Sequence, residues 1–138
     1  MKTAAGISKR EYARRYDEYA DKLWYFALQV SGDELSARRL MAELFVKGYF
    51  CCSEDNFLFD MAASLWRIME SCAPKAVCET PGGLPLLHGF DTAERAAVLL
   101  KALFSMTDTE ISDILDISQS DIADIHARLV KRMKTMAG

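Results

Sequence analysis

Apolar side chains recur at helical spacing along most of the chain, so the sequence predicts an all-α fold. A first helix begins after Ser8 and stops at Gly32, because glycine readily ends a helix in the left-handed conformation. A second helix begins after Asp33 and runs to about Phe50. The predicted inward positions are Tyr12, Tyr16, Ala20, Leu23, Ala27 and Val30 in the first helix, and Leu40, Leu44 and Phe45 in the second.

Two further helices are predicted on either side of a stretch in which the apolar pattern stops. The third helix follows a cap at Ser53 or Asp55 and ends before Pro74. The fourth begins at Asp91, which makes a capping box with Glu94. The predicted inward positions are Phe57, Met61, Leu65, Ile68 and Cys72 in the third helix, and Ala97, Val98, Leu100 and Leu103 in the fourth. Prolines and glycines between these two helices predict a linker.

Residues 107–133 predict a short helix, a turn and a longer helix. Thr107 with Glu110, and Ser118 with Asp121, form the capping pairs that open the two helices. Asp116 lies at the turn, because Asp tolerates the left-handed conformation better than most residues. The apolar faces comprise Ile111, Ile114 and Leu115, then Ile122, Ile125, Leu129 and Met133. This layout is typical of a helix-turn-helix, whose second helix enters a DNA groove.

The helices therefore predict two small three-helix domains joined by a Pro/Gly-containing linker, the second domain being the helix-turn-helix. The domains span residues 1–73 and 91–138, and the linker spans residues 74–90. A single compact domain is the alternative. In that arrangement the apolar linker residues Leu84, Pro85, Leu86, Leu87 and Phe90 pack between the two halves.

Composition and charge limit where in the cell the protein is expected and which kinds of partner it is expected to bind. The net charge of -3 argues against broad nucleic-acid affinity, although it leaves room for a local basic patch. No apolar run approaches the roughly 20 residues that span a bilayer, and the N-terminus lacks the apolar segment of a signal peptide. We therefore expect a cytoplasmic protein without a membrane partner. Its cysteines, Cys51, Cys52, Cys72 and Cys78, are expected to be reduced thiols, and the adjacent pair cannot both face one core.

No motif in the chain points to a catalytic or metal site. Cys72, Cys78 and His88 lack a recognised zinc spacing. The Pro-Gly-Gly turn at 81–83 lacks the preceding strand and the following Lys-Ser/Thr of a phosphate loop. His126 flanks an apolar face and is expected to be a partly buried packing residue. We expect no metal, no cofactor and no enzymatic activity.

Two long stretches of the chain resemble sigma factors of the extracytoplasmic-function group. They are LWYFALQVSGDELSARRLMAELFVKGY in the first half and DTAERAAVLLKALFSMTDTEISDILDISQSDIADIHARLVKRMK in the second. The resemblance covers approximately Tyr12 to Lys134, and TEISDILDIS follows the family's helix-turn-helix closely. In that family the first helical domain binds core RNA polymerase and the melted downstream promoter element. The second domain reads the upstream element through its helix-turn-helix.

The resemblance implies three functional surfaces. The polymerase-binding positions are Arg39, Leu40, Ala42, Glu43 and Phe45. Contacts to single-stranded promoter DNA fall on Phe57, Phe59, Trp66 and Arg67. Contacts to duplex DNA fall on Gln119, Ser120, Asp121, Ala123, Asp124, Arg128, Lys131 and Arg132.

The charge on the predicted helix-turn-helix leaves a second hypothesis open. Residues 107–126 contain six carboxylates and no Lys or Arg, and Arg39 stands where the family has an acidic residue. DNA affinity depends strongly on phosphate neutralisation by Lys and Arg. The sequence thus supports a sigma-factor-like transcription protein whose partners are core RNA polymerase and promoter DNA. The alternative is a sigma-like interaction module that no longer binds DNA and binds another protein or itself.

Overall fold

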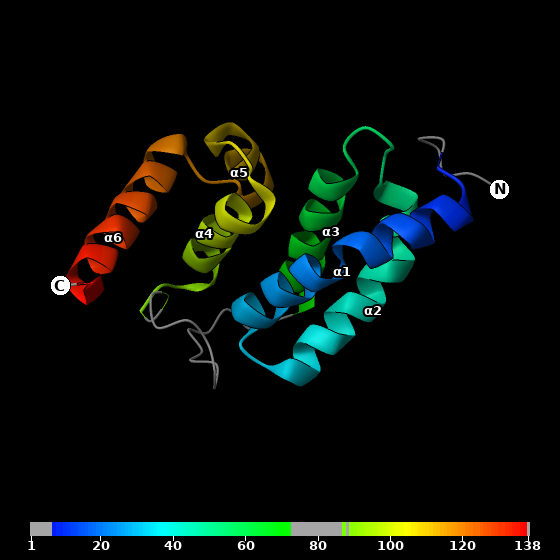
Figure 1. Ribbon diagram of the computed structural model, residues 1–138, viewed down its shortest axis with the longest axis horizontal. Helices are drawn as coiled ribbons and strands as arrows, with labels where there is room; N and C mark the ends of the chain where they lie inside the picture. Colours follow the sequence, from blue (N-terminus) through cyan, green and yellow to red (C-terminus); the bar gives the residue numbers. More distant parts are fainter. Residues whose placement is uncertain (1–6, 73–86, 88, 138) are drawn as a thin grey trace.

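The computed structural model describes residues 7–72, 87 and 89–137, and this part of the chain contains six helices and no strand. Figure 1 shows their arrangement. The helices are α1 (Lys9–Ser31), α2 (Glu34–Cys51), α3 (Phe57–Cys72), α4 (Thr92–Phe104), α5 (Asp108–Leu115) and α6 (Gln119–Ala137). The predicted all-α class is confirmed. Within the described ranges no helix is long and apolar enough to cross a membrane.

Local capping interactions fix the ends of the first helices where the sequence predicts them. The Glu11 backbone N–H donates to Ser8 Oγ at 3.2 Å, and α1 stops at Gly32, whose φ of 77° is left-handed. Asp33 then caps α2 by accepting from the Ser36 backbone N–H at 2.9 Å. The short Gly32–Asp33 connection turns α2 back, so that α2 packs against both α1 and α3.

Local capping interactions also fix the ends of the helices in the second half of the chain. Capping boxes open α4 at Asp91 and α5 at Thr107, as predicted. Asp116 ends α5 with a left-handed φ of 56°, and three residues later α6 begins. Ser118 Oγ accepts from the Asp121 backbone N–H at 3.0 Å. Ser105, a non-glycine residue with φ 54°, turns the chain between α4 and α5, a conformation that the sequence does not predict.

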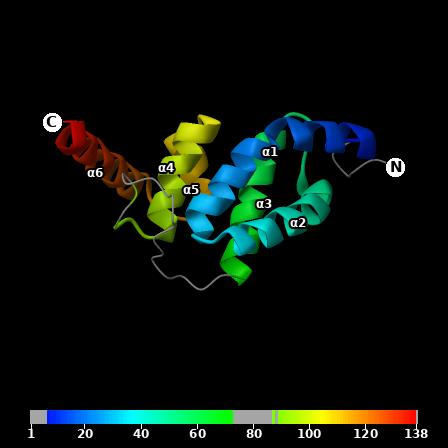
Figure 2. The ribbon, with the colours of Figure 1, turned by 60° about the horizontal axis from the view of Figure 1, so that its bottom comes forward.

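The two halves pack against each other through α1 and α4, which lie side by side in Figures 1 and 2. Phe26 of α1 and Phe104 of α4 are buried, with ring centroids 5.8 Å apart in an edge-on arrangement. One cluster of buried side chains extends through both halves and includes Leu87 and Phe90. This packing agrees with the compact alternative, while the division into domains at 1–73 and 91–138 stays a prediction. The rest of the predicted linker, including Leu84 and Leu86, lies outside the described residues.

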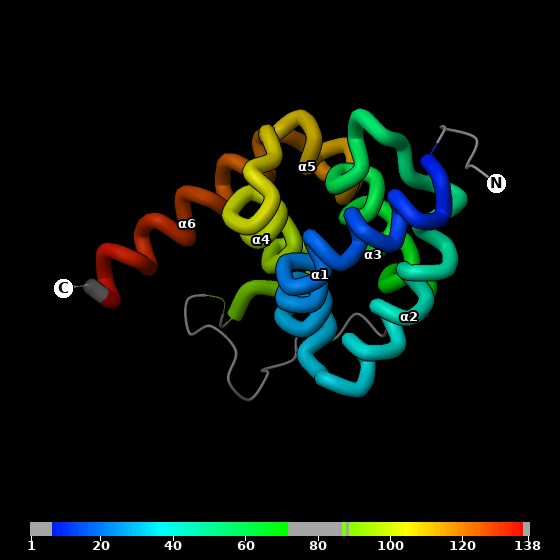
Figure 3. Tube along the Cα trace, turned by 45° about the vertical axis from the view of Figure 1, so that its right-hand side comes forward, coloured from blue at the N-terminus to red at the C-terminus, as the bar shows by residue number. Residues whose placement is uncertain are grey.

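Two predicted inward positions are wrong. Phe45 is 43 % exposed, because it lies at the edge of α2, where one side of its ring contacts Tyr12 and Tyr16 and the other faces solvent. Met133 is 48 % exposed. The reason is that α6 projects beyond the helices that cover its first half, as Figure 3 shows. The apolar periodicity of α6 therefore continues further than the core that receives it.

Candidate interaction surfaces

The outer face of α2 exposes several large apolar side chains. Leu35 is 58 % exposed, Val46 63 % and Phe50 73 %, although all three lie on a helix whose opposite face is buried. Ala42 is exposed between them, and the spacing of seven, four and four residues places all four on one side of the helix. We call Leu35, Ala42, Val46 and Phe50 the α2 outer stripe. A helix that is apolar on both faces normally has both faces covered, so the stripe indicates a protein-binding surface.

Charged side chains border the α2 outer stripe. Arg38 pairs with Glu34 at 2.8 Å, and Lys47 pairs with Glu43 at 3.3 Å, each one helical turn away. Arg39 is exposed on the same side as the stripe and makes no ion pair with any described residue. A partner of α2 would therefore meet apolar side chains interrupted by one cation.

An aromatic cluster beneath α2 holds the helix in place. The Tyr12 hydroxyl donates to the Phe45 carbonyl oxygen at 2.7 Å, and the Tyr12 ring lies 5.3 Å from that of Tyr49. Burial raises the pKa of Tyr12, so its phenol remains a donor at neutral pH. Gly48 permits this close packing, because a Cβ there would lie 2.9 Å from Tyr12 Oη and 2.7 Å from Met61 Sδ.

The predicted polymerase-binding residues do not all reach the surface of α2. Arg39, Ala42 and Phe45 are exposed, and Glu43 is half-buried. Leu40 is only 5 % exposed and packs in the core, where it supports the helix from inside. The role of these positions in binding polymerase stays a prediction.

Sequence reasoning missed Leu35, Val46 and Phe50. A signal for them exists, since their spacing is helical and they lie on the side opposite Leu40 and Leu44. Periodicity alone cannot rank two apolar faces of one helix, so only the packing of α1 and α3 on the inner face identifies the outer one.

The predicted contacts to single-stranded DNA are not brought together on one surface. Phe57 is 4 % exposed and Trp66 5 %, and both pack in the core. Phe59 is half-buried and Arg67 is exposed. Base stacking needs an accessible ring face and cations along the backbone track. In this arrangement only Phe59 and Arg67 have accessible groups, so the predicted stacking role of Phe57 and Trp66 requires α3 to be uncovered.

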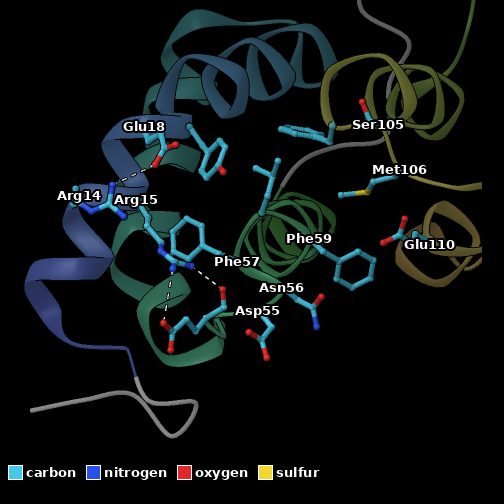
Figure 4. A pocket seen from close by; sticks show the side chains of 14 residues that line it. Arg14, Arg15, Glu18, Asp55, Asn56, Phe57, Phe59, Ser105, Met106 and Glu110 are labelled. Atoms are coloured by element: carbon cyan, nitrogen blue, oxygen red, sulfur yellow. Dashed lines mark hydrogen bonds and ion pairs between the residues drawn. The ribbon is translucent and has the colours of Figure 1, made fainter.

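A pocket of about 530 Å³ lies between α1, the start of α3 and the turn from α4 to α5. Figure 4 shows Phe59 on its α5 side and two arginines on its α1 side. Arg14 and Arg15 both pair with Glu11, at 2.6 and 2.9 Å, and Arg15 also donates to the Glu54 carbonyl oxygen at 2.6 Å. These pairings lower the pKa of Glu11 to about 2. The guanidinium groups are thus held by neighbouring acceptors, which is typical of a structural network.

The predicted DNA-reading residues lie at the exposed start of α6. The Gln119 side chain donates to Thr109 Oγ1 of α5 at 3.3 Å, which links the two helices of the pair. The other predicted positions in the first two turns are also exposed: Ser120, Asp121, Ala123 and Asp124. The first two turns of α6 are therefore accessible and carry negative charge.

The basic end of α6 contacts the start of α4. Arg128 pairs with Glu94, and the guanidinium groups of Arg128 and Arg132 lie 5.2 and 5.3 Å from the centre of the Phe90 ring. Together with Phe90, Arg128 and Arg132, Lys131 lines a groove of about 350 Å³. Two of the three predicted phosphate-binding cations therefore also help to dock α6 on the rest of the fold.

His126 lies where α4, α5 and α6 meet. Its side chain is 19 % exposed, and its Nδ1 lies 3.9 Å from Asp108 Oδ1. Burial, together with the charge of Lys101, lowers the pKa of His126 below its ordinary value of 6.5. The predicted role as a partly buried packing residue is confirmed.

Cysteine and metal chemistry adds no site among the described residues. Cys52 is buried and Cys51 is exposed, so the prediction that the adjacent pair cannot share one core is confirmed. In the described ranges no three His, Cys, Asp or Glu side chains gather as metal ligands. Cys78, His88 and the side chain of Cys72 lie outside the described residues.

Comparison with known proteins gives no family assignment. No protein-family model matches the chain, and no curated protein matches it significantly. Inferences about function therefore depend on the surfaces described above and on the sequence resemblance.

Proposed function

We propose that the protein is a sigma-factor-like transcription protein that binds core RNA polymerase through the α2 outer stripe and promoter DNA through the helix-turn-helix formed by α5 and α6. The observation that carries the proposal is the exposure of Leu35, Val46 and Phe50 on a helix with a second, fully covered apolar face. In the sigma family that this sequence resembles, the corresponding helix contacts the polymerase.

The α2 outer stripe has the dimensions of a helix-binding surface. Residues 35–50 extend over about 22 Å at the rise of an α-helix, which suits packing along a partner helix. Val46 and Phe50 lie one turn apart and are the most exposed apolar side chains of the stripe. Large aromatic side chains commonly dominate the binding energy of an interface, so Phe50, the most exposed apolar side chain of the stripe, is the expected anchor.

The proposed DNA contact uses the start of α6 for reading and its end for phosphates. Gln119 and Ser120 are exposed and have hydrogen-bonding groups suited to base edges in the major groove. Lys131 and Arg132, a little more than three turns further along, supply cations for the phosphate backbone. Asp121 and Asp124 then lie along α6 between the residues proposed to read bases and those proposed to bind phosphates.

A second candidate function follows from those two carboxylates. Both are exposed, and no Lys or Arg accompanies them in the first half of α6. Negative charge on this face opposes binding to phosphates. In this alternative the protein is a sigma-like interaction module, which keeps the α2 contact and has lost the DNA contact.

Polymerase binding is tested by affinity measurements between the purified chain and core RNA polymerase of its host. Val46→Glu/Phe50→Glu should weaken binding at least roughly a hundredfold, because two carboxylates would replace the apolar anchors. Met136→Glu is the matched control, since Met136 is 54 % exposed at the far end of α6. Circular dichroism should show that all three proteins fold. The proposal is wrong if the unmodified chain does not bind polymerase, and the role of α2 is wrong if the double variant binds normally.

DNA binding separates the two candidate functions. If α6 contacts promoter DNA, the affinity of the polymerase complex for its promoter should fall steeply with salt, and Lys131→Ala should reduce the salt slope by about one. Polymerase binding without any promoter selectivity would instead support the interaction module.

A further inference from the structure

A groove of about 240 Å³ lies between α2 and α3, two helices that pack directly against each other. Its lining residues are Lys47 and Cys51 of α2 and Ser64, Arg67, Ile68 and Ser71 of α3. On each helix these residues share one face, because they are spaced by about one or two helical turns. We call this feature the α2–α3 groove.

The α2–α3 groove is lined by two cations and no carboxylate. Lys47 pairs at 3.3 Å with Glu43, which lies one turn earlier on α2 and does not line the groove. Arg67 is exposed and makes no ion pair with any described residue. Its guanidinium therefore has donors available for an oxygen acceptor in the groove. The charge of the lining favours an anionic ligand.

A buried hydroxyl in the same groove lacks a partner. Ser64 is 5 % exposed, and its Oγ makes no hydrogen bond with any described residue. The hydroxyl of Ser71, in contrast, donates to the Ile68 carbonyl oxygen at 2.9 Å. Buried polar groups in proteins are normally hydrogen-bonded, and leaving one unsatisfied is destabilising. An oxygen acceptor bound beside Ser64 would supply the missing hydrogen bond.

From this arrangement we infer that the α2–α3 groove binds a phosphate group, either as the free ion or on a small phosphorylated molecule. A phosphate dianion has enough charge for both cations. Its oxygens can accept from Arg67, from Lys47 and from the Ser64 hydroxyl at the same time. A single carboxylate has one charge and two oxygens, so it would leave part of this donor set unmatched.

The size and the lining of the α2–α3 groove select a small ligand. Its volume lies below the roughly 300–1,000 Å³ of pockets that bind drug-sized molecules. No aromatic side chain lines it, whereas proteins that bind single-stranded nucleic acid provide rings on which bases stack. The inference does not depend on the proposed function, because phosphate binding is measured on the isolated chain without polymerase or DNA.

Titration of the isotope-labelled full chain with inorganic phosphate, followed by NMR at constant ionic strength, tests the inference. At about pH 8, where phosphate is mainly a dianion, we expect saturable shifts of the backbone amides of residues 47–51 and 64–71. Arg67→Gln and Lys47→Gln should each weaken binding at least about fivefold, because each removes a charge-assisted hydrogen bond. Lys134→Gln, which removes one positive charge from an exposed position near the end of α6, should leave the affinity unchanged.

Ser64→Ala separates a ligand-binding role from a structural one. The substitution removes a hydroxyl that has no partner among the described residues, so the free energy of unfolding should not fall. The affinity for phosphate should nevertheless fall about threefold, because the ligand loses one donor. An unchanged affinity would remove Ser64 from the site and overturn the donor set inferred above.

Alkylation of Cys51 gives a second readout, because this thiol is exposed and lines the groove. The ratio of its rates with anionic iodoacetate and neutral iodoacetamide should be higher in the wild-type chain than in Arg67→Gln, since the cations attract the carboxylate. Both reagents react with the thiolate, so the ratio does not depend on the ionisation of the thiol. Phosphate at constant ionic strength should slow both reactions, and peptide mapping assigns them to Cys51.

Comparison of ligands distinguishes the sources of the phosphate group. Tighter binding of glycerol 3-phosphate than of inorganic phosphate would support a phosphorylated molecule, and the reverse order would support the free ion. The inference is overturned by phosphate that gives no saturable shifts, by acetate that binds as tightly as phosphate, or by an unchanged affinity in Arg67→Gln. An oligothymidylate that binds the same residues far more tightly than phosphate would assign the groove to nucleic acid and overturn it too. None of these results bears on polymerase binding.

Discussion

α2 and α6 each have one face in the core and one face in solvent, yet their uncovered faces differ in kind. On α2 the uncovered face carries Leu35, Val46 and Phe50, which gain free energy from leaving water. On α6 the uncovered face is mainly charged: Asp121, Asp124 and Lys131 are exposed, and Arg128 is half exposed while it pairs with Glu94. The uncovered faces of α2 and α6 therefore contribute differently to binding. An apolar face supplies affinity, and a charged row mainly selects the partner and its orientation.

The inner faces of the same two helices differ as well. The buried residues of α2 extend from Ala37 to Gly48, because α1 and α3 cover most of the helix. Among the residues of α6 whose burial is described, only Ile122 and Ile125 are buried, and Leu129 is half-buried. A larger fraction of α2 than of α6 is therefore buried, so truncating an inner side chain should cost more free energy of unfolding on α2.

The largest effect is expected for Leu44→Ala on the inner face of α2. Leu44 is fully buried, so the substitution leaves a cavity and should lower the free energy of unfolding by about 2–5 kcal/mol. Val46→Ala, two residues away on the outer stripe, should change it by less than about 0.5 kcal/mol. Urea denaturation of both variants measures the contrast. Equal losses of unfolding free energy in the two variants would show that the α2 outer stripe is covered within the monomer.

A smaller contrast is expected along α6. Ile125→Val removes one buried methylene and should cost about 0.5–1.5 kcal/mol of unfolding free energy, because Ile125 is only 4 % exposed. Met133→Ala should cost less than about 0.5 kcal/mol, since Met133 lies on the projecting end of the helix. Urea denaturation of both variants measures the difference. A large loss for Met133→Ala would contradict the exposure of the end of α6.

The smallest effect is expected from pH. The pKa of His126 is lower in the folded chain than its ordinary value of 6.5, because burial disfavours the imidazolium. Above 6.5 the side chain is neutral in both states and its contribution is fully present; as pH falls below 6.5 the unfolded chain gains the proton first and stability is lost. Urea denaturation between about pH 7.5 and 5.5 should show this decrease, and His126→Gln should reduce it. An unchanged pH dependence in the variant would assign the effect to other groups.

The helices and most of their boundaries could be predicted because caps act locally. Ser8, Asp33, Asp91 and Thr107 each satisfy backbone N–H groups within the next three residues, so the sequence contains all the partners. The left-handed turn at Ser105 escaped prediction, because serine has no special preference for that conformation. The buried Leu87 and Phe90 were foreseen only in the compact alternative.

The candidate surfaces were harder to predict than the helices. Phe57, Trp66 and Leu40 have the side chains that their assigned roles require, yet they are buried. Exposure depends on which elements pack over a residue, and periodicity does not contain that information. The separation of acidic from basic residues along α6, in contrast, could be predicted from the sequence, because it depends only on the order of the residues.

The all-helical class, the capped helix ends and the separation of acidic and basic residues along α6 all follow from the order of the amino acids. These features depend on interactions between residues a few positions apart. The tertiary structure alone decided which apolar face of α2 is covered, where α6 leaves the core and that Phe26 meets Phe104 across the two halves. The physical reason is that burial is a property of contacts between distant segments, and only the folded chain specifies them.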